Sequence, residues 1–423
     1  MRGFAMTEKM KPSGIAWIGD IPQDWNIKRV KYLASLKGRI GWQGLTSDEY
    51  IDEGPYLITG IDFQNGGIDW NNCVHISEER WAEAPEIHIQ NGDLLITKDG
   101  TVGKVAIVSG LEGKASLNSG VLLIRTNPDF DKRFLFWVLQ SEEFWTWFRL
   151  KNAGNSTIIH LYQGDFAEFS YTFPNTAEQR AIADFLDTQC AKIDSVIANI
   201  EKQIETLQKY KKSLIIETVT KGCAAGSKTK TVQLDFADEI NEAWIETRVK
   251  YLCSMYSGDN LTSSDIEPEG DYPVYGGNGL RGFYAAYTND GEHVLIGRQG
   301  ALCGNVHLVS GKFWATDHAV VTYPYEGTCN GYLFYLFSAM NLNQYSQTAA
   351  QPGLAVAAIQ NLSTCIPPTT EIQQEIAKYL DEKCGKIDSI IEAKRKQLEI
   401  MEEHKKSLIY EYVTGKKRVT EVN

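Results

Sequence analysis

The stretch Ile182-Ala-Asp-Phe-Leu-Asp187 returns 194 residues later as Ile376-Ala-Lys-Tyr-Leu-Asp381. At the same offset, Lys211-Lys-Ser-Leu-Ile215 returns as Lys405-Lys-Ser-Leu-Ile409. From residue 182 to residue 220, 21 of 39 positions are identical to their counterparts, without a gap. Identity at one fixed offset over this length indicates an internal duplication.

Both copies of this stretch are predicted to be long helices. Thr176-Ala-Glu-Gln179 and Thr370-Glu-Ile-Gln373 fit the capping box that opens a helix, and prolines precede both of them. Apolar side chains then follow at alternating steps of four and three residues, which is the spacing of a coiled-coil seam. The predicted seam consists of Ile193, Ile197, Ile200, Ile204, Leu207, Ile387, Ile391, Leu398 and Met401.

Lysines fall on the same predicted seam, at Lys211, Lys394 and Lys405. A polar residue at such a position lowers stability but can fix the register and orientation of the helices. Two matched heptad helices in one chain most simply pack on each other, antiparallel if a pseudo-twofold axis relates the halves. The alternative is that each helix packs on its own domain or on another subunit.

The segments that precede the two helices also correspond, although more loosely. Trp25-Asn-Ile-Lys-Arg-Val-Lys-Tyr-Leu33 is similar to Trp244-Ile-Glu-Thr-Arg-Val-Lys-Tyr-Leu252. Short β-rich runs alternate with helical patterns, among them Phe134–Phe148 and Tyr332–Met340. The predicted fold class is α+β, with two mixed α/β lobes separated by two long antiparallel coiled-coil-like helices and pseudo-twofold symmetry. The predicted lobes are residues 15–174 and 235–368, and the predicted helical regions are residues 175–222 and 369–415.

Composition narrows the class of protein. With 423 residues, 43% of them hydrophobic and 23% charged, the chain can form two or three domains with proper cores. No apolar run approaches the roughly 18 residues of a membrane helix, and the first residues lack the apolar core of a signal peptide. None of the eight cysteines forms a CxxC pair, so we expect reduced thiols in a cytoplasmic protein without a zinc ribbon.

The sequence contains no recognisable catalytic set. It has no Walker A motif, no Asn/Asp-Pro-Pro-Tyr/Phe motif and no HExxH motif, so we expect a non-catalytic chain that binds no metal. Gly277-Asn-Gly-Leu-Arg-Gly282 fits the pattern GxGxxG, but neither a helix start nor a suitably spaced acid follows it. We therefore interpret it as a glycine-rich turn that could bring Tyr275, Asn278 and Arg281 close to a nucleic-acid groove.

The charge balance restricts any contact with nucleic acid. The chain has 42 basic and 54 acidic residues, for a formal net charge of −12. Between Gly41 and Thr97 there are eleven acids and a single base, Arg80. Most of the surface of this stretch must therefore face away from phosphates, and we expect DNA affinity of the chain alone to be modest.

Several of these motifs together resemble a known family. Trp17-Ile-Gly-Asp-Ile-Pro-Gln-Asp-Trp25, followed by Arg29-Val-Lys-Tyr-Leu33, resembles the opening of specificity subunits of type I restriction–modification enzymes. Asp93–Val105, Tyr272–Gly282 and the Pro, acidic, Gln, Ile signature before each helix belong to the same pattern. The similarity extends from Trp17 to Val413.

The resemblance implies a non-catalytic subunit with two target recognition domains, each reading one half of a bipartite sequence in the major groove of double-stranded DNA. The helical regions would hold these domains apart and bind two modification (methyltransferase) subunits. Residues 190–219 would span roughly 45 Å as a helix, which exceeds one turn of duplex DNA.

The resemblance also places the chemistry on other chains. The assembled complex would methylate adenine with S-adenosylmethionine, and restriction subunits using ATP and Mg would cleave unmethylated DNA. The chain itself is expected to carry no cofactor, to act in the cytoplasm and to have no membrane partner.

Candidate DNA-binding residues are polar or aromatic side chains on glycine-rich loops. Arginine pairs with guanine, and asparagine or glutamine pairs with adenine, through two hydrogen bonds each. Lys98 and Arg298 hold equivalent positions before Gly100 and Gly300. The full set of DNA-binding candidates is Trp42, Gln43, Lys98, Lys104, Asn118, Tyr275, Asn278, Arg281, Arg298 and His318.

Two other functions remain open at the level of sequence. A coiled-coil assembly protein without nucleic-acid function would share the long helices, and copurification with a large methyltransferase would separate the two hypotheses. A self-sufficient nuclease or methyltransferase would need the motifs that are missing, and a cleavage or methylation assay of the isolated chain would reveal it.

Overall fold

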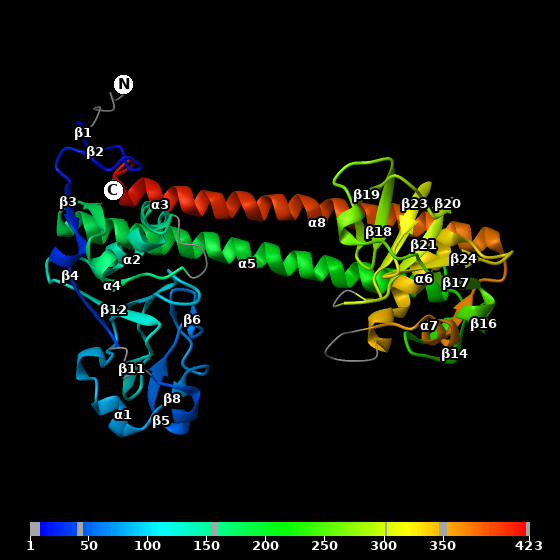
Figure 1. The fold of residues 1–423 in the computed structure, drawn as a ribbon, viewed down its shortest axis with the longest axis horizontal. Helices are drawn as coiled ribbons and strands as arrows, with labels where there is room; N and C mark the ends of the chain where they lie inside the picture. Colours follow the sequence, from blue (N-terminus) through cyan, green and yellow to red (C-terminus); the bar gives the residue numbers. More distant parts are fainter. Residues whose placement is uncertain are drawn as a thin grey trace. The chain divides into compact units, whose positions relative to one another are not determined.

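The computed structural model of the protein describes residues 9–39, 45–153, 159–224, 226–300, 303–346 and 353–419. The chain divides into two compact units (Figure 1). Unit 1 consists of Met1–Asn199 with Gln397–Asn423, and unit 2 consists of Ile200–Lys396. Two long helices, α5 (Thr176–Lys221) and α8 (Thr370–Val413), contribute residues to both units. Each unit thus contains one lobe, one part of α5 and one part of α8.

The lobe of unit 1 is built on a four-stranded antiparallel sheet in the order β10-β9-β12-β4. A mixed sheet has the order β11-β5-β8, with β11 parallel to β5, and β3 pairs with β13. The strands are β1 (Met10–Pro12), β2 (Asp20–Pro22), β3 (Asn26–Arg29), β4 (Ala34–Gly38), β5 (Ile51–Ile58), β6 (Phe63–Gln64), β7 (Gly67–Ile68), β8 (Val74–His75), β9 (Leu94–Thr97), β10 (Val105–Ile107), β11 (Ala115–Leu117), β12 (Val121–Thr126) and β13 (Ser170–Phe173). The α-helices are α1 (Glu78–Ala82), α2 (Lys132–Gln140), α3 (Glu142–Lys151) and α4 (Gln163–Ala167).

The lobe of unit 2 repeats this plan. Its antiparallel sheet has the order β22-β21-β24-β17, its mixed sheet has the order β19-β18-β23-β20 with β23 parallel to β18, and β16 pairs with β25. The strands are β14 (Thr229–Leu234), β15 (Ala237–Asn241), β16 (Ile245–Arg248), β17 (Cys253–Ser257), β18 (Tyr272–Gly276), β19 (Gly279–Tyr284), β20 (Asn289–Asp290), β21 (His293–Gly297), β22 (Val306–Val309), β23 (Lys312–Ala315), β24 (Ala319–Pro324) and β25 (Ser363–Ile366). The α-helices are α6 (Asn330–Met340) and α7 (Val356–Asn361). The predicted α+β fold with two mixed lobes and two long helices is confirmed.

Each part of the long helices is built into the core of the lobe in its own unit. In unit 1, Leu186 of α5 and Val413 of α8 belong to the same buried cluster as Trp25 and Phe134. The corresponding cluster of unit 2 contains Val219, Leu380, Tyr332 and Phe337. The helices therefore pack on the lobes and, through the same clusters, on each other, so the two packing alternatives are not exclusive.

A buried glutamine joins α5 to the lobe of unit 1. Gln179 is 1% exposed, and its side-chain amide donates to the carbonyl oxygen of Pro174 at 2.9 Å. Its side-chain oxygen accepts from the backbone N–H of Asp131 at 2.9 Å. Asp131 in turn caps α2, because its carboxylate accepts from the N–H of Arg133. One side chain thus connects the start of α5 with the start of α2.

The same connection exists in unit 2. Gln373 donates to the carbonyl oxygen of Gly327 at 3.0 Å and accepts from the N–H of Cys329 at 2.9 Å, directly before α6. A second pair of equivalent bonds lies about two turns further along each long helix. The indole of Trp137 donates to Asp187, and the hydroxyl of Tyr335 donates to Asp381. The identity of the two glutamines and of the two aspartates between the copies therefore has a structural cause.

The predicted capping boxes are wrong in detail. Asn175, one residue before Thr176, accepts from the N–H of Glu178 at 3.1 Å, and Thr369 holds the corresponding place before α8. The two glutamines are unavailable for capping because their amides bond to the lobes.

The predicted helix Phe134–Phe148 is also wrong. It is interrupted at Ser141, whose backbone is extended and whose hydroxyl donates to the carbonyl oxygen of Val138. The predicted segment is therefore two helices, α2 and α3.

Replacing Gln373 by alanine is expected to lower the free energy of unfolding by about 1–3 kcal/mol, because the buried side chain of Gln373 makes two hydrogen bonds, to the backbone of Gly327 and Cys329, that the variant loses. Denaturant melts of the full chain measure the effect. Gln374→Ala is the matched control, since Gln374 is exposed on the same turn. Equal stability of the two variants would contradict the assignment.

The core of unit 1 contains a buried acid. Glu143 of α3 is fully buried and forms no ion pair among the described residues, and only the backbone N–H of Thr172 favours its charged form. Burial raises the pKa of this carboxyl well above its ordinary value of 4.5. In the unfolded chain the group ionises at its ordinary pKa, so its contribution opposes folding increasingly as the pH rises above that value.

Glu143→Gln is therefore expected to raise the free energy of unfolding at pH 7 by about 1–3 kcal/mol, and to have little effect at pH 4, where both states of the parent are protonated. Urea melts over pH 4–8 measure the difference. Glu142→Gln, at the exposed neighbouring position, is the control. A difference between variant and parent that does not grow with pH would refute a buried acid of raised pKa.

Candidate nucleic-acid interface

The loops after β9 and β21 have equivalent backbone hydrogen bonds. The N–H of Lys98 donates to the carbonyl oxygen of Gly120 at 2.8 Å. In unit 2, the N–H of Arg298 donates to the carbonyl oxygen of His318 at 2.9 Å. Lys98 and Arg298 thus occupy the same place in the two lobes, at the end of a central strand.

Each of these loops is closed by a glycine. The N–H of Gly103 donates to the carbonyl oxygen of Thr97 at 2.9 Å, and the N–H of Gly304 donates to the carbonyl oxygen of Gly297 at 2.7 Å. Both glycines have a positive φ, +85° and +88°. A Cβ at Gly103 would lie 2.3 Å from the ring of Trp145, so a side chain is sterically impossible there without rearrangement.

A third segment of each lobe returns to the same loop. The N–H of Leu161 donates to the carbonyl oxygen of Lys98 at 3.0 Å, and the N–H of Leu354 donates to that of Arg298 at 2.9 Å. The backbone framework is therefore shared between the units. The side chains on this framework differ between the units. Asp99 carries a carboxylate, whereas its counterpart Gln299 carries an amide.

Unit 2 brings four of the predicted residues together around one hairpin. The glycine-rich motif is the tight turn between β18 and β19, as predicted, and a Cβ at Gly277 would lie 3.1 Å from the carbonyl oxygen of His318 and 3.7 Å from the nitrogen of Arg298. Asn278 lies on this turn and accepts from the side-chain amide of Asn305 at 3.1 Å. Tyr275 of β18 lies close to the same segment, because its carbonyl oxygen accepts from the N–H of Thr316, two residues before His318.

The two arginines of this region keep their positive charge available. Arg298 donates to the hydroxyl of Ser257 at 2.8 Å, and Arg281 donates to that of Ser263 at 3.5 Å. Neither forms an ion pair with a described carboxylate. A guanidinium held by a neutral partner retains further N–H donors for a base edge or a phosphate.

In unit 1, Lys98, Lys104 and Asn118 lie on neighbouring loops. Lys104 donates to the carbonyl oxygen of Gly60 at 3.4 Å, and the amide of Asn118 donates to the hydroxyl of Tyr50 at 3.4 Å. Trp42 and Gln43, the remaining predicted residues, lie outside the described residues. The structure therefore assembles a polar loop cluster in this lobe from the three described candidates.

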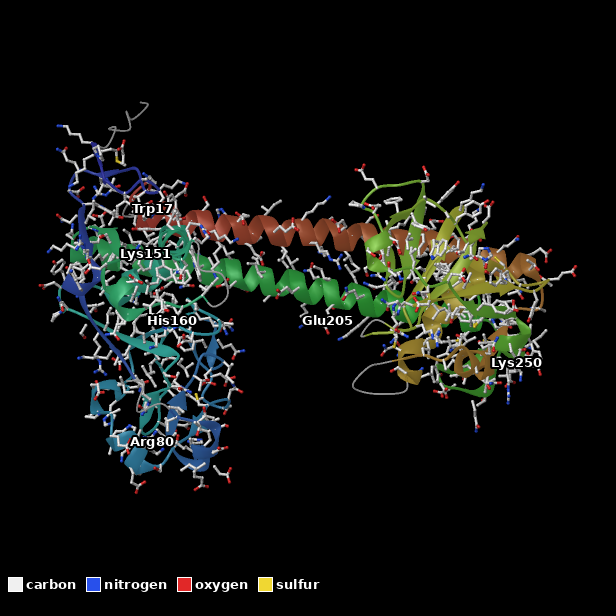
Figure 2. All side chains as sticks on the ribbon, viewed as in Figure 1. Trp17, Arg80, Lys151, His160, Glu205 and Lys250 are labelled. Atoms are coloured by element: carbon white, nitrogen blue, oxygen red, sulfur yellow. The ribbon has the colours of Figure 1, made fainter. Side chains whose placement is uncertain are left out.

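Some neighbours of these loops were not among the predicted residues. The Nδ1 of His160 pairs with the Oδ1 of Asp99, and Figure 2 shows His160 within unit 1. Ile61, which is 74% exposed, follows Gly60, the residue whose carbonyl oxygen accepts from Lys104. Tyr162, which is 58% exposed, follows Leu161, the residue whose N–H donates to the carbonyl oxygen of Lys98. Asn305 could have been found from the sequence, because Gly304-Asn-Val306 aligns with Gly103-Lys-Val105. The others depend on tertiary contacts that no local pattern reveals.

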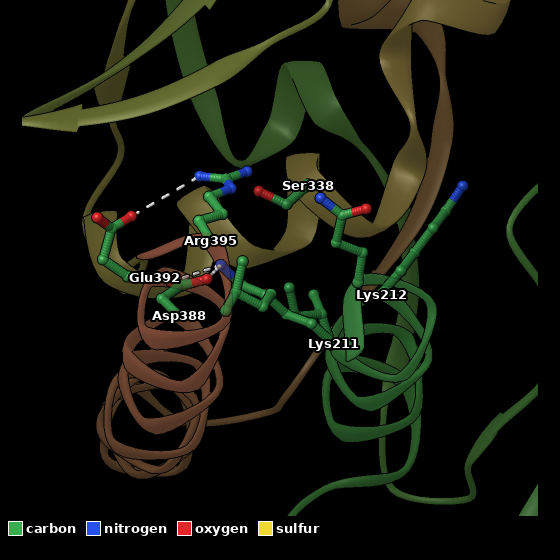
Figure 3. Close-up of a pocket in the computed structure, with 9 residues that line it drawn as sticks. Lys211, Lys212, Ser338, Asp388, Glu392 and Arg395 are labelled. Atoms are coloured by element: carbon green, nitrogen blue, oxygen red, sulfur yellow. Dashed lines mark hydrogen bonds and ion pairs between the residues drawn. The ribbon is translucent and has the colours of Figure 1, made fainter. Parts of the chain in front are cut away.

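The seam lysines connect the two long helices inside each unit. In unit 1, Lys405 of α8 donates to Asp194 of α5 at 2.6 Å. In unit 2, Lys211 of α5 donates to Asp388 of α8 at 2.7 Å, as Figure 3 shows. Both the lysines and the aspartates are 194 residues apart, so the two ion pairs are the same contact formed twice.

The helix parts run antiparallel within each unit. In unit 2, Lys394 of α8 bonds to Gln203 of α5, and Asp388 of α8 bonds to Lys211 of α5. Residue numbers therefore increase along α5 in the direction in which they decrease along α8. Among the predicted seam residues, Ile200, Ile387 and Ile391 are buried. The half-buried ones are Ile193, Ile197, Ile204, Leu207, Leu398 and Met401.

The described residues hold no group of three or more His, Cys, Asp or Glu side chains suited to a metal ion. All eight cysteines are free thiols, and burial raises the pKa of the Cys190 thiol to about 11, so it stays protonated at neutral pH. Within the same part of the chain, no helix is long and apolar enough to cross a membrane.

Comparison with known proteins agrees with this architecture. The family model described as the type I restriction modification DNA specificity domain matches residues 22–206 and 241–400. The specificity subunit of the type I restriction enzyme EcoprrI from Escherichia coli is 44% identical over 148 residues, which cover 34% of this chain and 37% of that protein. A protein of Methanocaldococcus jannaschii, provisionally named the MjaX specificity subunit, is 27% identical over 95% of this chain and 96% of its own length.

A solved structure has the same fold. It comes from work on complex assembly and conformational transition of the type I restriction–modification system. It superposes with a TM-score of 0.70 at 15% sequence identity, over 94% of this chain and 99% of that chain.

Proposed function

The chain belongs to the type I restriction–modification DNA specificity family, and we propose that it is a non-catalytic subunit that reads a bipartite target in double-stranded DNA, one half-site per unit. The two matched specificity domains make DNA recognition its activity. The proposal adds the division of labour between the units. Its single strongest support is the pair of loops that share a backbone framework and differ in their side chains.

The side chains on these loops suit the reading of base edges. A guanidinium can donate two hydrogen bonds to guanine, and an asparagine amide can pair with adenine in the same way. Unit 2 offers Arg298, Arg281 and Asn278 around one hairpin. Unit 1 offers Lys98, Lys104 and Asn118 instead. Different donors on the same framework favour different half-sites, one for each unit.

We further propose that the long helices bind two modification subunits, with restriction subunits joining the complex. The helices are the most closely repeated part of the chain, and repeated surfaces suit repeated partners. Adenine methylation with S-adenosylmethionine and cleavage driven by ATP with Mg would then belong to those partners. Under this proposal the chain works in the cytoplasm, beside the genome.

Family membership and the equivalent loops favour this function over a coiled-coil assembly protein without nucleic-acid binding. Such a protein would need the two helices, but it would need neither a glycine-closed loop nor free arginines around a hairpin in its lobes. A self-sufficient nuclease or methyltransferase is disfavoured, since the sequence lacks the motifs of both.

Exchanging residues 15–174 for the corresponding lobe of a specificity subunit with another target is expected to change one half-site only, because the core of this lobe is formed entirely within unit 1. Mapping of methylated adenines in cells with the assembled complex measures the outcome. Exchange of residues 235–368 is the reciprocal control and should change the other half-site. A swap of the first lobe that alters both half-sites would count against one unit per half-site.

Arg298→Ala is expected to weaken binding of the cognate duplex by the assembled complex roughly 10- to 100-fold and to relax discrimination at one base pair, as for the loss of a bidentate contact. Fluorescence anisotropy with single-base variants of the duplex measures both effects. Lys312→Ala, which removes an equal charge from unit 2 outside the long helices, is the control. Equal weakening for every sequence would instead identify Arg298 as a phosphate contact.

A further inference from the structure

The lobes share one identical five-residue sequence. Arg29-Val-Lys-Tyr-Leu33 of unit 1 returns as Arg248-Val-Lys-Tyr-Leu252 in unit 2. Both form a single turn of 3-10 helix. The N–H of Leu33 donates to the carbonyl oxygen of Val30 at 2.8 Å, and the N–H of Leu252 donates to the carbonyl oxygen of Val249 at 2.9 Å. The two copies therefore have the same backbone as well as the same side chains.

Core packing explains only part of this identity. The valine and the leucine of each copy are buried, so they must fit the cores. The arginine, lysine and tyrosine point outward instead. Tyr32 is 60% exposed, and Tyr251 is 66% exposed. We call these three residues of each copy the Arg-Lys-Tyr patch: Arg29, Lys31 and Tyr32 in unit 1, and Arg248, Lys250 and Tyr251 in unit 2.

The exposed side chains also have the same arrangement in both patches. The ammonium of Lys31 lies 5.2 Å from the centre of the Tyr32 ring, and that of Lys250 lies 5.3 Å from the centre of the Tyr251 ring. Figure 2 shows Lys250 at the surface of unit 2. A cation–π contact at an exposed position adds little to stability, so it does not by itself require that both residues be repeated.

The immediate surroundings of the patches have diverged. Arg29 and Lys31 both donate to the carboxylate of Glu168, at 2.7 and 2.6 Å, whereas Lys250 donates to the amide oxygen of Asn361 at 3.4 Å. The exposed Lys28, on the strand that leads into the first patch, has Thr247 as its counterpart. Identity is thus retained at the three outward positions even where their neighbours have changed.

The patches lie at the opposite end of the sheet from the candidate reading loops. The patch of unit 1 precedes Ala34, which pairs with Thr126, whereas the Lys98 loop bonds to Gly120 before the other end of β12. Val121 and Thr126, the two ends of β12, are five residue steps apart, roughly 16 Å at 3.3 Å per step. A surface placed away from the divergent loops suits a partner that both units meet in the same form.

We propose that the two Arg-Lys-Tyr patches are docking surfaces for two copies of one protein, the modification subunit, which would present carboxylates to the basic side chains and a hollow to the tyrosine ring. The inference rests on the proposed function. Identical surfaces call for an identical partner, and tyrosine and arginine are the side chains that most often anchor protein interfaces. Guanidinium and ammonium groups form their strongest hydrogen bonds with carboxylates.

The test uses the full chain with purified modification subunit. Lys31→Glu with Tyr32→Ala alters unit 1, Lys250→Glu with Tyr251→Ala alters unit 2, and a fourfold variant alters both. Native mass spectrometry counts the bound modification subunits, and titration calorimetry gives their Kd. Each altered patch is expected to weaken one of the two binding events at least tenfold and to leave the other unchanged. The fourfold variant should weaken both.

Lys312→Glu with Tyr287→Ala is the matched control, because Lys312 lies over the Tyr287 ring at 4.7 Å outside the repeat, and it should bind as the parent does. Lys31→Glu with Lys250→Glu keeps both rings and provides a milder variant if the others melt early. Unchanged binding of two subunits by the fourfold variant overturns the docking surface while the proposed function stands. Loss of DNA affinity with unchanged subunit binding overturns it in favour of phosphate contact. A parent chain that binds no modification subunit refutes the proposed function, and this inference with it.

Discussion

The buried amides of Gln179 and Gln373 are the contacts on which the architecture depends. Each is almost completely removed from solvent and bonds to two backbone groups. Gln179 bonds to Pro174 beside α5 and to Asp131 before α2, and Gln373 bonds to Gly327 and Cys329 before α6. Buried backbone groups without such a partner would be costly, so these bonds define the direction in which each lobe leaves its helix. Asp187 and Asp381 fix the same junction a second time. A reading loop can be placed reproducibly only on a junction that is held in this way.

The sequence predicted the parts of the fold that depend on local periodicity. The helical heptads and the fixed offset of 194 residues indicated two long helices, and the loose match of the flanking segments indicated two related lobes. What it could not predict were partners far along the chain. Gln179 looked like a capping residue because its spacing from Thr176 fits a capping box, but the N–H it bonds lies 48 residues away at Asp131. Ser141 broke a helix that the apolar pattern alone would continue.

The same limit applies to the candidate interface. Lys98 and Arg298 were recognised as equivalent because glycines follow both at the same distance, and the structure gives them equivalent backbone bonds. The approach of Gly277 to Arg298 and His318 joins two segments about twenty and forty residues apart, which spacing cannot reveal. The pairing of Asp99 with His160 likewise depends on how the chain returns before α5. Local signals therefore identified the loops, and tertiary packing determined their neighbours.

The distribution of charge separates specificity from affinity. Phosphate contacts supply most of the binding free energy of a protein on DNA, and a chain with a net charge of −12 offers few of them. The candidate loops carry only a few cations, and Arg298 and Lys104 among them donate to neutral partners. Under the proposed function, modification subunits bound by the chain would add the remaining contacts around the duplex. A subunit that discriminates between sequences but binds weakly by itself gains from this arrangement, because stable binding would then require both a correct target and an assembled complex.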